Sequence, residues 1–166
     1  MSGRAPPPRR VRPSLLDRLL DDAPGTARDG PAGPADSPAA LRNAVRRDLE
    51  ALLNARRRWR SWPSEMAALA VSPLGYGLPD FAAGAFNDPA RREELRVDIE
   101  DTIRRFEPRL SRVQVAVAEA DDTLRPTLHL RIEALLHAEP APEPVAFDTL
   151  VDPATDNVLI RADEAG

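Results

Sequence analysis

The spacing of hydrophobic residues changes at one point of the chain. Leu95, Ile99 and Ile103 recur at helical spacing up to residue 106, whereas Val113 and Val115 alternate with polar residues just beyond it. The change of period, from about 3.6 residues to 2, predicts a helix over residues 89–106 followed directly by a strand over residues 112–118.

Glu107, Pro108 and Arg109 occupy the corner between these two elements. Proline cannot donate a backbone hydrogen bond, and it pushes the preceding residue toward extended geometry. On an extended segment, Glu107 and Arg109 point to the same side, about 7 Å apart. Because a stiff corner limits how closely the two charges approach each other, we predict that these three residues bind a partner protein. The alternative is an internal ion pair. On the first interpretation, replacing either charge by alanine leaves the fold intact.

Two further patterns complete the predicted fold. A helix that begins at Ser37 and Pro38 carries one apolar stripe, and alternating segments at 127–136, 145–150 and 158–161 follow the first strand. Helices first and strands later predict an α+β fold, with N-terminal helices packed on one face of a small antiparallel sheet of three to four strands. The stripe of the helix consists of Leu41, Val45, Leu49, Leu52 and Leu53.

The N-terminal region lacks the long periodic segments of the rest of the chain. We predict a disordered leader rich in proline and arginine (1–13), a tethered amphipathic helix (14–22), a flexible linker (23–38), a single α+β domain (39–161) and a short tail (162–166). A helix of under three turns is not stable alone in water, so it must pack against its own core or dock in a groove of a partner. Its apolar residues are Leu15, Leu16, Leu19 and Leu20.

Composition narrows the classes of function. The chain has 166 residues, a net charge of −4 and no cysteine. Its acidic balance argues against a general nucleic-acid binder, and the absence of thiols excludes disulfides and thiolate metal sites. The sequence contains neither the apolar run of a signal peptide nor the roughly 20 apolar residues of a membrane span. We therefore expect a cytoplasmic protein that does not insert into a membrane.

A pair of carboxylates is the first catalytic hypothesis, because Glu100, Asp101 and Glu107 are close in sequence. Glycoside hydrolysis needs one carboxyl group that stays protonated and a second carboxylate nearby. The neighbouring arginines favour the charged form of Glu107 instead. The pattern therefore argues against glycoside hydrolysis at these carboxylates.

Other candidate sites are weaker. His129 and His137 have no second ligand at metal-binding spacing, and no phosphate-binding or dinucleotide-binding motif is present, so we expect no metal and no cofactor. Residues 56–62 interleave arginines with Trp59 and Trp62, as single-strand nucleic-acid binders do. The interpretation we favour is a solvated helix end whose tryptophans return to the core.

Four short motifs occur in an order that resembles one family. They are SLLDRL (14–19), RDLEALLN (47–54), YGLPD (76–80) and FEPRL (106–110). The set is similar to that of the TssE family, the type VI secretion baseplate subunits, which resemble the wedge protein of contractile phage tails (gene product 25). The Glu-Pro-Arg signature of the family falls on residues 107–109 without substitution, whereas the long leader and linker depart from the pattern.

The resemblance implies a structural role, with no catalytic residue and no enzyme activity. Such proteins join the wedge proteins TssF and TssG, with TssK as a further candidate partner, and offer a first docking platform to the contractile sheath of TssB and TssC, in a cytoplasmic baseplate docked at the inner membrane. It implies that a sheath arm adds as a strand to an edge of the sheet, and that the helix at 14–22 holds a wedge neighbour. An older label for the family is lysozyme-like. A second class remains open, because the fold also resembles that of small anti-adaptor proteins that regulate the proteolysis of a sigma factor.

Overall fold

A computed structural model of the chain describes residues 37–59, 61–80, 88–118, 128–138, 141–152 and 157–162. The expected leader (1–13), the expected helix (14–22) and nearly all of the expected linker lie outside the described residues. Residues 163–166 of the expected tail do so as well.

Two long helices begin where a capping residue precedes a proline. Helix α2 spans Pro38–Asn54 and helix α3 spans Pro89–Phe106. The side chain of Ser37 accepts from the backbone N–H of Ala40 at 3.1 Å, and Asp88 does the same for Ala90 at 2.9 Å. A cap followed by proline suits the first turn, where backbone N–H groups lack partners within the helix. Ser37 and Pro38, which the predicted linker included, are the cap and the first residue of α2.

Four strands form one antiparallel sheet in chain order. They are β3 (Leu110–Ala118), β4 (Leu128–Leu136), β5 (Glu143–Asp152) and β6 (Asn157–Ala162). The predicted strands are confirmed, although β3 begins two residues earlier than the alternation indicated. The register shifts between Ser111 and Gln114, and Arg112 there has a positive φ of 51°. A β-bulge of this kind adds a residue to one strand and interrupts the alternation of its side chains, so the start of the strand does not show a period of 2.

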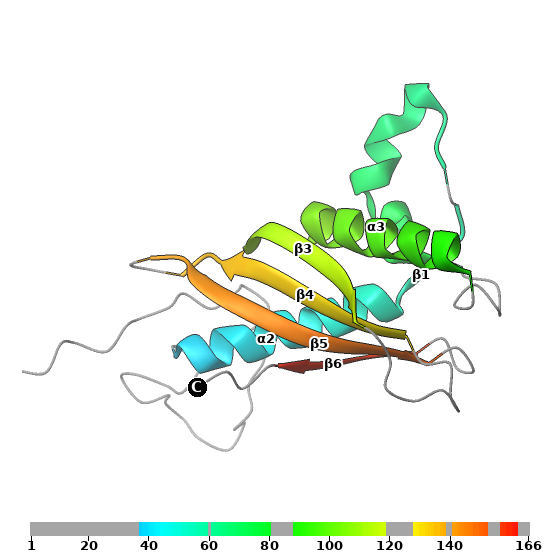
Figure 1. Ribbon diagram of the computed structural model, residues 1–166. Helices are drawn as coiled ribbons and strands as arrows, with labels where there is room; N and C mark the ends of the chain where they lie inside the picture. Colours follow the sequence, from blue (N-terminus) through cyan, green and yellow to red (C-terminus); the bar gives the residue numbers. More distant parts are fainter. Residues whose placement is uncertain are drawn as a thin grey trace, which may run out of the picture.

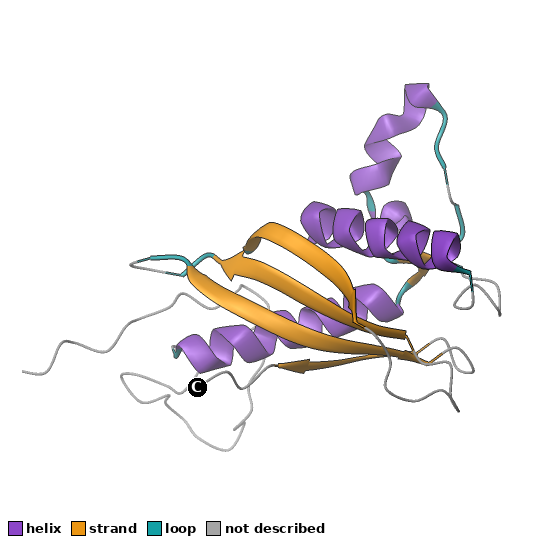
Figure 2. Cartoon of the chain, viewed as in Figure 1, coloured by secondary structure: helices purple, strands orange, loops and turns teal. Residues whose placement is uncertain are grey.

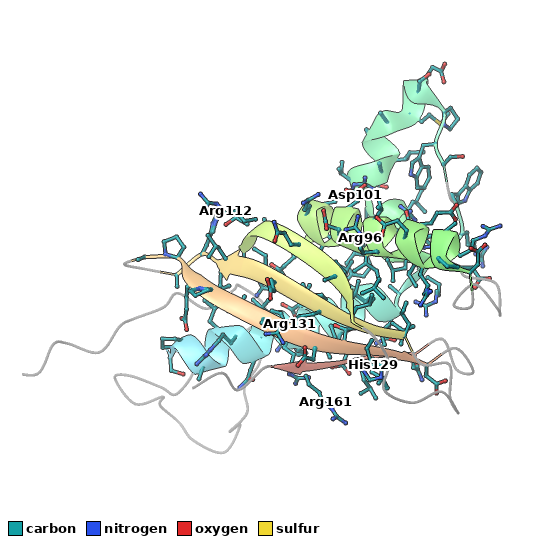
Figure 3. The ribbon with its side chains drawn as sticks, in the orientation of Figure 1. Arg96, Asp101, Arg112, His129, Arg131 and Arg161 are labelled. Atoms are coloured by element: carbon teal, nitrogen blue, oxygen red, sulfur yellow. The ribbon has the colours of Figure 1, made fainter. Side chains whose placement is uncertain are left out.

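The helices and the sheet enclose one hydrophobic core. Alternate residues of the strands, such as Ile132 and Phe147, are buried against Leu49 of α2 and Ile99 of α3. The polar residues of β4 and β6 lie on the other face, where Figure 3 labels His129, Arg131 and Arg161. In Figure 2 the long helices α2 and α3 form one layer and the four-stranded sheet forms the other. The predicted α+β class, with helices N-terminal to an antiparallel sheet, is confirmed.

A projecting segment joins the two helices. Two short parallel strands, β1 (Arg56–Arg57) and β2 (Leu78–Pro79), pair at its base, and the 3₁₀ helices η2 (Ser64–Val71) and η3 (Pro73–Gly75) lie beyond them. In Figure 1 this blue-green segment stands away from the sheet, on the side of α3. No residue of η2 is buried. We call the described residues of 59–75 the arm.

The base of the arm depends on a close backbone approach. The N–H of Leu78 donates to the carbonyl of Ala55 at 2.9 Å, and Gly77 before it has a φ of 94°. A Cβ on Gly77 would lie 2.4 Å from that same carbonyl oxygen. Only glycine therefore fits at this return point, and Leu78 enters the core directly after it.

Candidate functional site

The predicted partner site lies at a tight turn, where α3 ends. Glu107 is the C-cap of α3, and its N–H donates to the carbonyl of Ile103 at 2.8 Å. Its backbone (φ −118°, ψ 79°) is not that of a strand, and its own carbonyl accepts from Leu110 at 3.1 Å. This turn brings the side chain of Arg109 back over Glu107.

Glu107 and Arg109 bind each other. The Nε of Arg109 donates to Oε1 of Glu107 at 2.6 Å, and its Nη2 donates to Oε2. Two parallel bonds between a guanidinium and a carboxylate are the strongest geometry of an ion pair. The expectation that the proline corner would hold the two charges apart is wrong, because Pro108 and Arg109 lie in a turn and not on an extended segment.

Asp48 of α2 joins the pair across the fold. Its Oδ2 accepts from Nη2 of Arg109 at 2.6 Å, although 61 residues separate the two in sequence. From the solvent side, Arg47 donates to the other oxygen of Asp48 at 2.8 Å. Arg109 therefore ties the end of α3 and the start of β3 to the middle of α2.

Tyr76, from the segment between α2 and α3, also lies near Asp48 and Glu107. Its ring meets that of Phe106 edge to face, with 5.4 Å between the ring centroids. Burial raises the pKa of the Tyr76 hydroxyl above its ordinary value, and the negative charges of Asp48 and Glu107 raise it further. We call Asp48, Tyr76, Phe106, Glu107 and Arg109 the corner cluster.

The corner cluster is largely withdrawn from solvent. The side chain of Glu107 is 6% exposed and that of Arg109 is 22% exposed. The hydrogen bond to Glu107 raises the pKa of Arg109, burial opposes that change, and Asp48 adds to the rise. Pro108, in contrast, is exposed. Of the three predicted partner-binding residues, the proline is thus the one whose side chain faces outward.

Sequence reasoning missed Asp48 and Tyr76 as members of this cluster. Both stand inside the short motifs at 47–54 and 76–80, but nothing in their local pattern indicates that they meet. Asp48 directly precedes Leu49, which is fully buried in the core. Its position beside a buried residue was the one local sign that its carboxylate lies near the body of the fold.

The geometry does not resemble that of a hydrolase site. Both carboxylate oxygens of Glu107 accept from Arg109, so neither is presented to a substrate. Glu100 is also engaged, because its Oε2 accepts from Arg96 at 2.9 Å. Among the described residues, no group of three or more His, Cys, Asp or Glu side chains could hold a metal ion.

The outer edge of β6 is closed by a side chain of α2. The amide of Asn54 donates to the carbonyl of Val158 and accepts from its N–H, each at 2.8 Å. In this way one side chain occupies both backbone groups that a neighbouring strand would use. Arg46 adds a longer bond to the carbonyl of Ile160, at 3.4 Å.

The outer edge of β3 is closed by charged side chains of α3. The N–H of Val115 donates to Glu100 at 3.1 Å, and its carbonyl accepts from Arg96 at 3.2 Å. Arg104 donates to the carbonyl of Val113 at 2.8 Å. Figure 3 labels Arg96 on α3 alongside β3. At both edges, therefore, helix side chains hold backbone groups that point away from the sheet.

The tryptophans do not return to the core, and that expectation is wrong. Trp59 is 59% exposed, and its ring stacks on that of Trp62 with 6.1 Å between centroids. The reason lies in the path of the chain, which leaves the body at β1 and comes back only at β2. Leu78, where the chain comes back, is buried in the core. The predicted docking leucines, Leu15, Leu16, Leu19 and Leu20, lie outside the described residues.

None of the described helices is long and apolar enough to cross a membrane. The fold is a small α+β module, and the charged side chains of Glu107 and Arg109 bind each other within the chain. Residues 39–141 match the family model described as baseplate wedge protein gp25. The chain belongs to this family of structural baseplate proteins. No curated protein matches it.

Proposed function

We propose that this protein is the TssE subunit of a type VI secretion baseplate. The observation that supports the proposal best is the meeting of three of the four family-like motifs. Asp48, Tyr76 and Arg109 come from separate motifs, and hydrogen bonds, ring contacts and charge join them in one cluster. All three lie within the matched residues 39–141.

The corner cluster fixes the shape of the surface that the baseplate uses. Arg109 clamps α2, α3 and β3 together, and the clamp presents Pro108 at the tip of a rigid turn. Glu107, Pro108 and Arg109 act on a partner as one unit in this proposal. The two charges hold the turn, and the proline makes the contact.

Strand addition from a sheath subunit remains part of the proposal, but the sheet edges are not open, and an incoming strand must displace helix side chains there. The edge groups of Val115 and Val158 are bonded to helix side chains and not to another strand. Side chains of this kind protect an edge against uncontrolled pairing with other sheets. An incoming strand exchanges these hydrogen bonds for its own, so the net gain in binding free energy at each site is small. Each additional hydrogen bond contributes about 0.5–1.5 kcal/mol. Repetition around the baseplate raises the total by avidity.

The partners follow from this role. The protein joins the wedge proteins TssF and TssG, with TssK as a further candidate partner, and offers its sheet to TssB and TssC, in a cytoplasmic baseplate at the inner membrane. Leu15, Leu16, Leu19 and Leu20 remain the predicted contact with a wedge neighbour.

Recovery of partners from cells with an intact secretion locus tests the proposal. We expect the tagged full chain to bring down TssF, TssG and sheath protein. A single signalling protein in their place would instead indicate an anti-adaptor. Hydrolysis of cell-wall material by the purified chain, lost in a Glu107→Gln variant, would indicate the lysozyme-like activity.

A further inference from the structure

The arm carries most of the large apolar side chains that are exposed among the described residues. Met66, Val71 and Leu74 are each more than half exposed, and so is Trp59 at the start of the arm. Apart from Glu65, the eight residues of η2 carry no charge. An apolar segment that projects from the body, as Figure 1 shows for this one, marks a site that something else covers.

The charges at the base of the arm limit what can cover it. Arg56, Arg57 and Arg58 precede Trp59, and Arg58 is exposed. Arg57 reaches Asp98 of α3 at 3.5 Å, but its Nε is buried with no hydrogen-bond partner. A matching segment would therefore combine large aliphatic side chains with carboxylates.

The chain itself contains such a segment. Residues 14–22 carry four leucines at helical spacing, and Asp17, Asp21 and Asp22 stand among them. Apart from Arg18, their charged residues are all acidic, opposite in sign to the arginines at the base of the arm. We infer that the leucines of residues 14–22 pack on the arm of the same chain, over the stacked pair of Trp59 and Trp62.

The tether is long enough for this contact. Helix α2 has 17 residues, so it places its first turn about 25 Å from the base of the arm. Residues 23–36 span up to about 46 Å when extended. The tether therefore reaches along the whole of α2 with length to spare. Because it holds the segment near the arm at high effective concentration, the contact forms within one chain.

The contact has a consequence for assembly. A wedge neighbour that uses the same four leucines must first remove them from the arm. The inference itself concerns the free chain, and it stands or fails separately from the proposed function.

Fluorescence tests the inference directly, because Trp59 and Trp62 are the only tryptophans of the chain. The full chain is compared with a full-length variant in which Leu15, Leu16, Leu19 and Leu20 are all serine. We expect the variant to emit at longer wavelength and to be quenched more strongly by acrylamide. A Val11→Ser variant, changed just before the segment, is the matched control and should behave like the full chain.

Charge reversal provides a second, milder variant. Asp21→Arg with Asp22→Arg should expose the tryptophans to acrylamide, whereas Asp29→Arg with Asp36→Arg in the tether should not. Equal emission and quenching in the full chain and the serine variant would overturn the inference. Protection that disappears on dilution would also overturn it, because the cover would then come from a second copy.

Discussion

The corner cluster and the arm differ from their sequence-based predictions in opposite ways. The corner carries an acid and a base around a proline and looks like a site for a partner, yet its charges bind one another below the surface. The arm carries tryptophans and aliphatic residues and looks like part of the core, yet it projects from the body. Residue type alone therefore does not say which segment is buried and which is exposed. The path of the backbone decides it.

The largest effect should follow from breaking the clamp. Arg109→Ala leaves the carboxylate of Glu107 buried without its partner, which costs about 3–5 kcal/mol. Urea denaturation measures the loss. This expectation replaces the one drawn from the sequence, that either charge could be removed without harm to the fold.

Two further variants sharpen that result. Arg105→Ala, on an exposed arginine of the same helix, should change the free energy of unfolding by no more than about 0.5 kcal/mol. Adding Glu107→Gln to Arg109→Ala should recover part of the loss, because no buried charge remains. If Arg109→Ala behaved like Arg105→Ala, the pair would not be a clamp.

A smaller effect is expected at the edge of β6. Asn54→Ala removes both hydrogen bonds to Val158, whose backbone groups then lie unpaired, at a cost of about 1–3 kcal/mol. Asn43→Ala, at an exposed position of the same helix, is the control and should be nearly neutral. Equal urea midpoints for the two variants would show that Asn54 does not hold the edge.

The pH dependence of Tyr76 reports on the corner cluster with little disturbance. Tyr76 is the only tyrosine of the chain, so its ultraviolet absorbance can be titrated alone. We expect its pKa to lie above the ordinary value of about 10 and to fall toward that value in Asp48→Asn or in urea. Since folding raises this pKa, its contribution to stability is present below about pH 10 and is lost as the pH rises through the folded value. An unshifted pKa in the native protein would place Tyr76 outside the cluster.

Much of the fold could be predicted from the sequence, because it depends on local signals. Ser37 with Pro38 and Asp88 with Pro89 mark the helix starts, and the alternation of β4 marks a sheet with one buried face. The start of β3 was missed because the bulge near Arg112 interrupts the alternation. The two-residue strands at the base of the arm are too short to leave any periodic pattern.

The candidate site was harder to predict than the fold. Glu107 and Arg109 could be found as a pair, but their partner Asp48 stands 61 residues from Arg109. The pairing of distant charges depends on how α2 and α3 pack on the sheet, which no local pattern encodes. For the same reason the exposure of Trp59 could not be foreseen, because it depends on where the chain re-enters the core.

A change at Pro108 separates the role of the corner in the fold from its proposed role in assembly. A Pro108→Asp variant alters the exposed tip and leaves the clamp of Glu107, Arg109 and Asp48 in place, so it should lower stability by about 1 kcal/mol or less. The most direct measurement counts fluorescent TssB sheaths in cells that carry this variant as their only copy of the protein. We predict few or no sheaths, while the purified variant unfolds at nearly the same urea concentration as the unchanged chain. Sheaths in normal number would contradict the account.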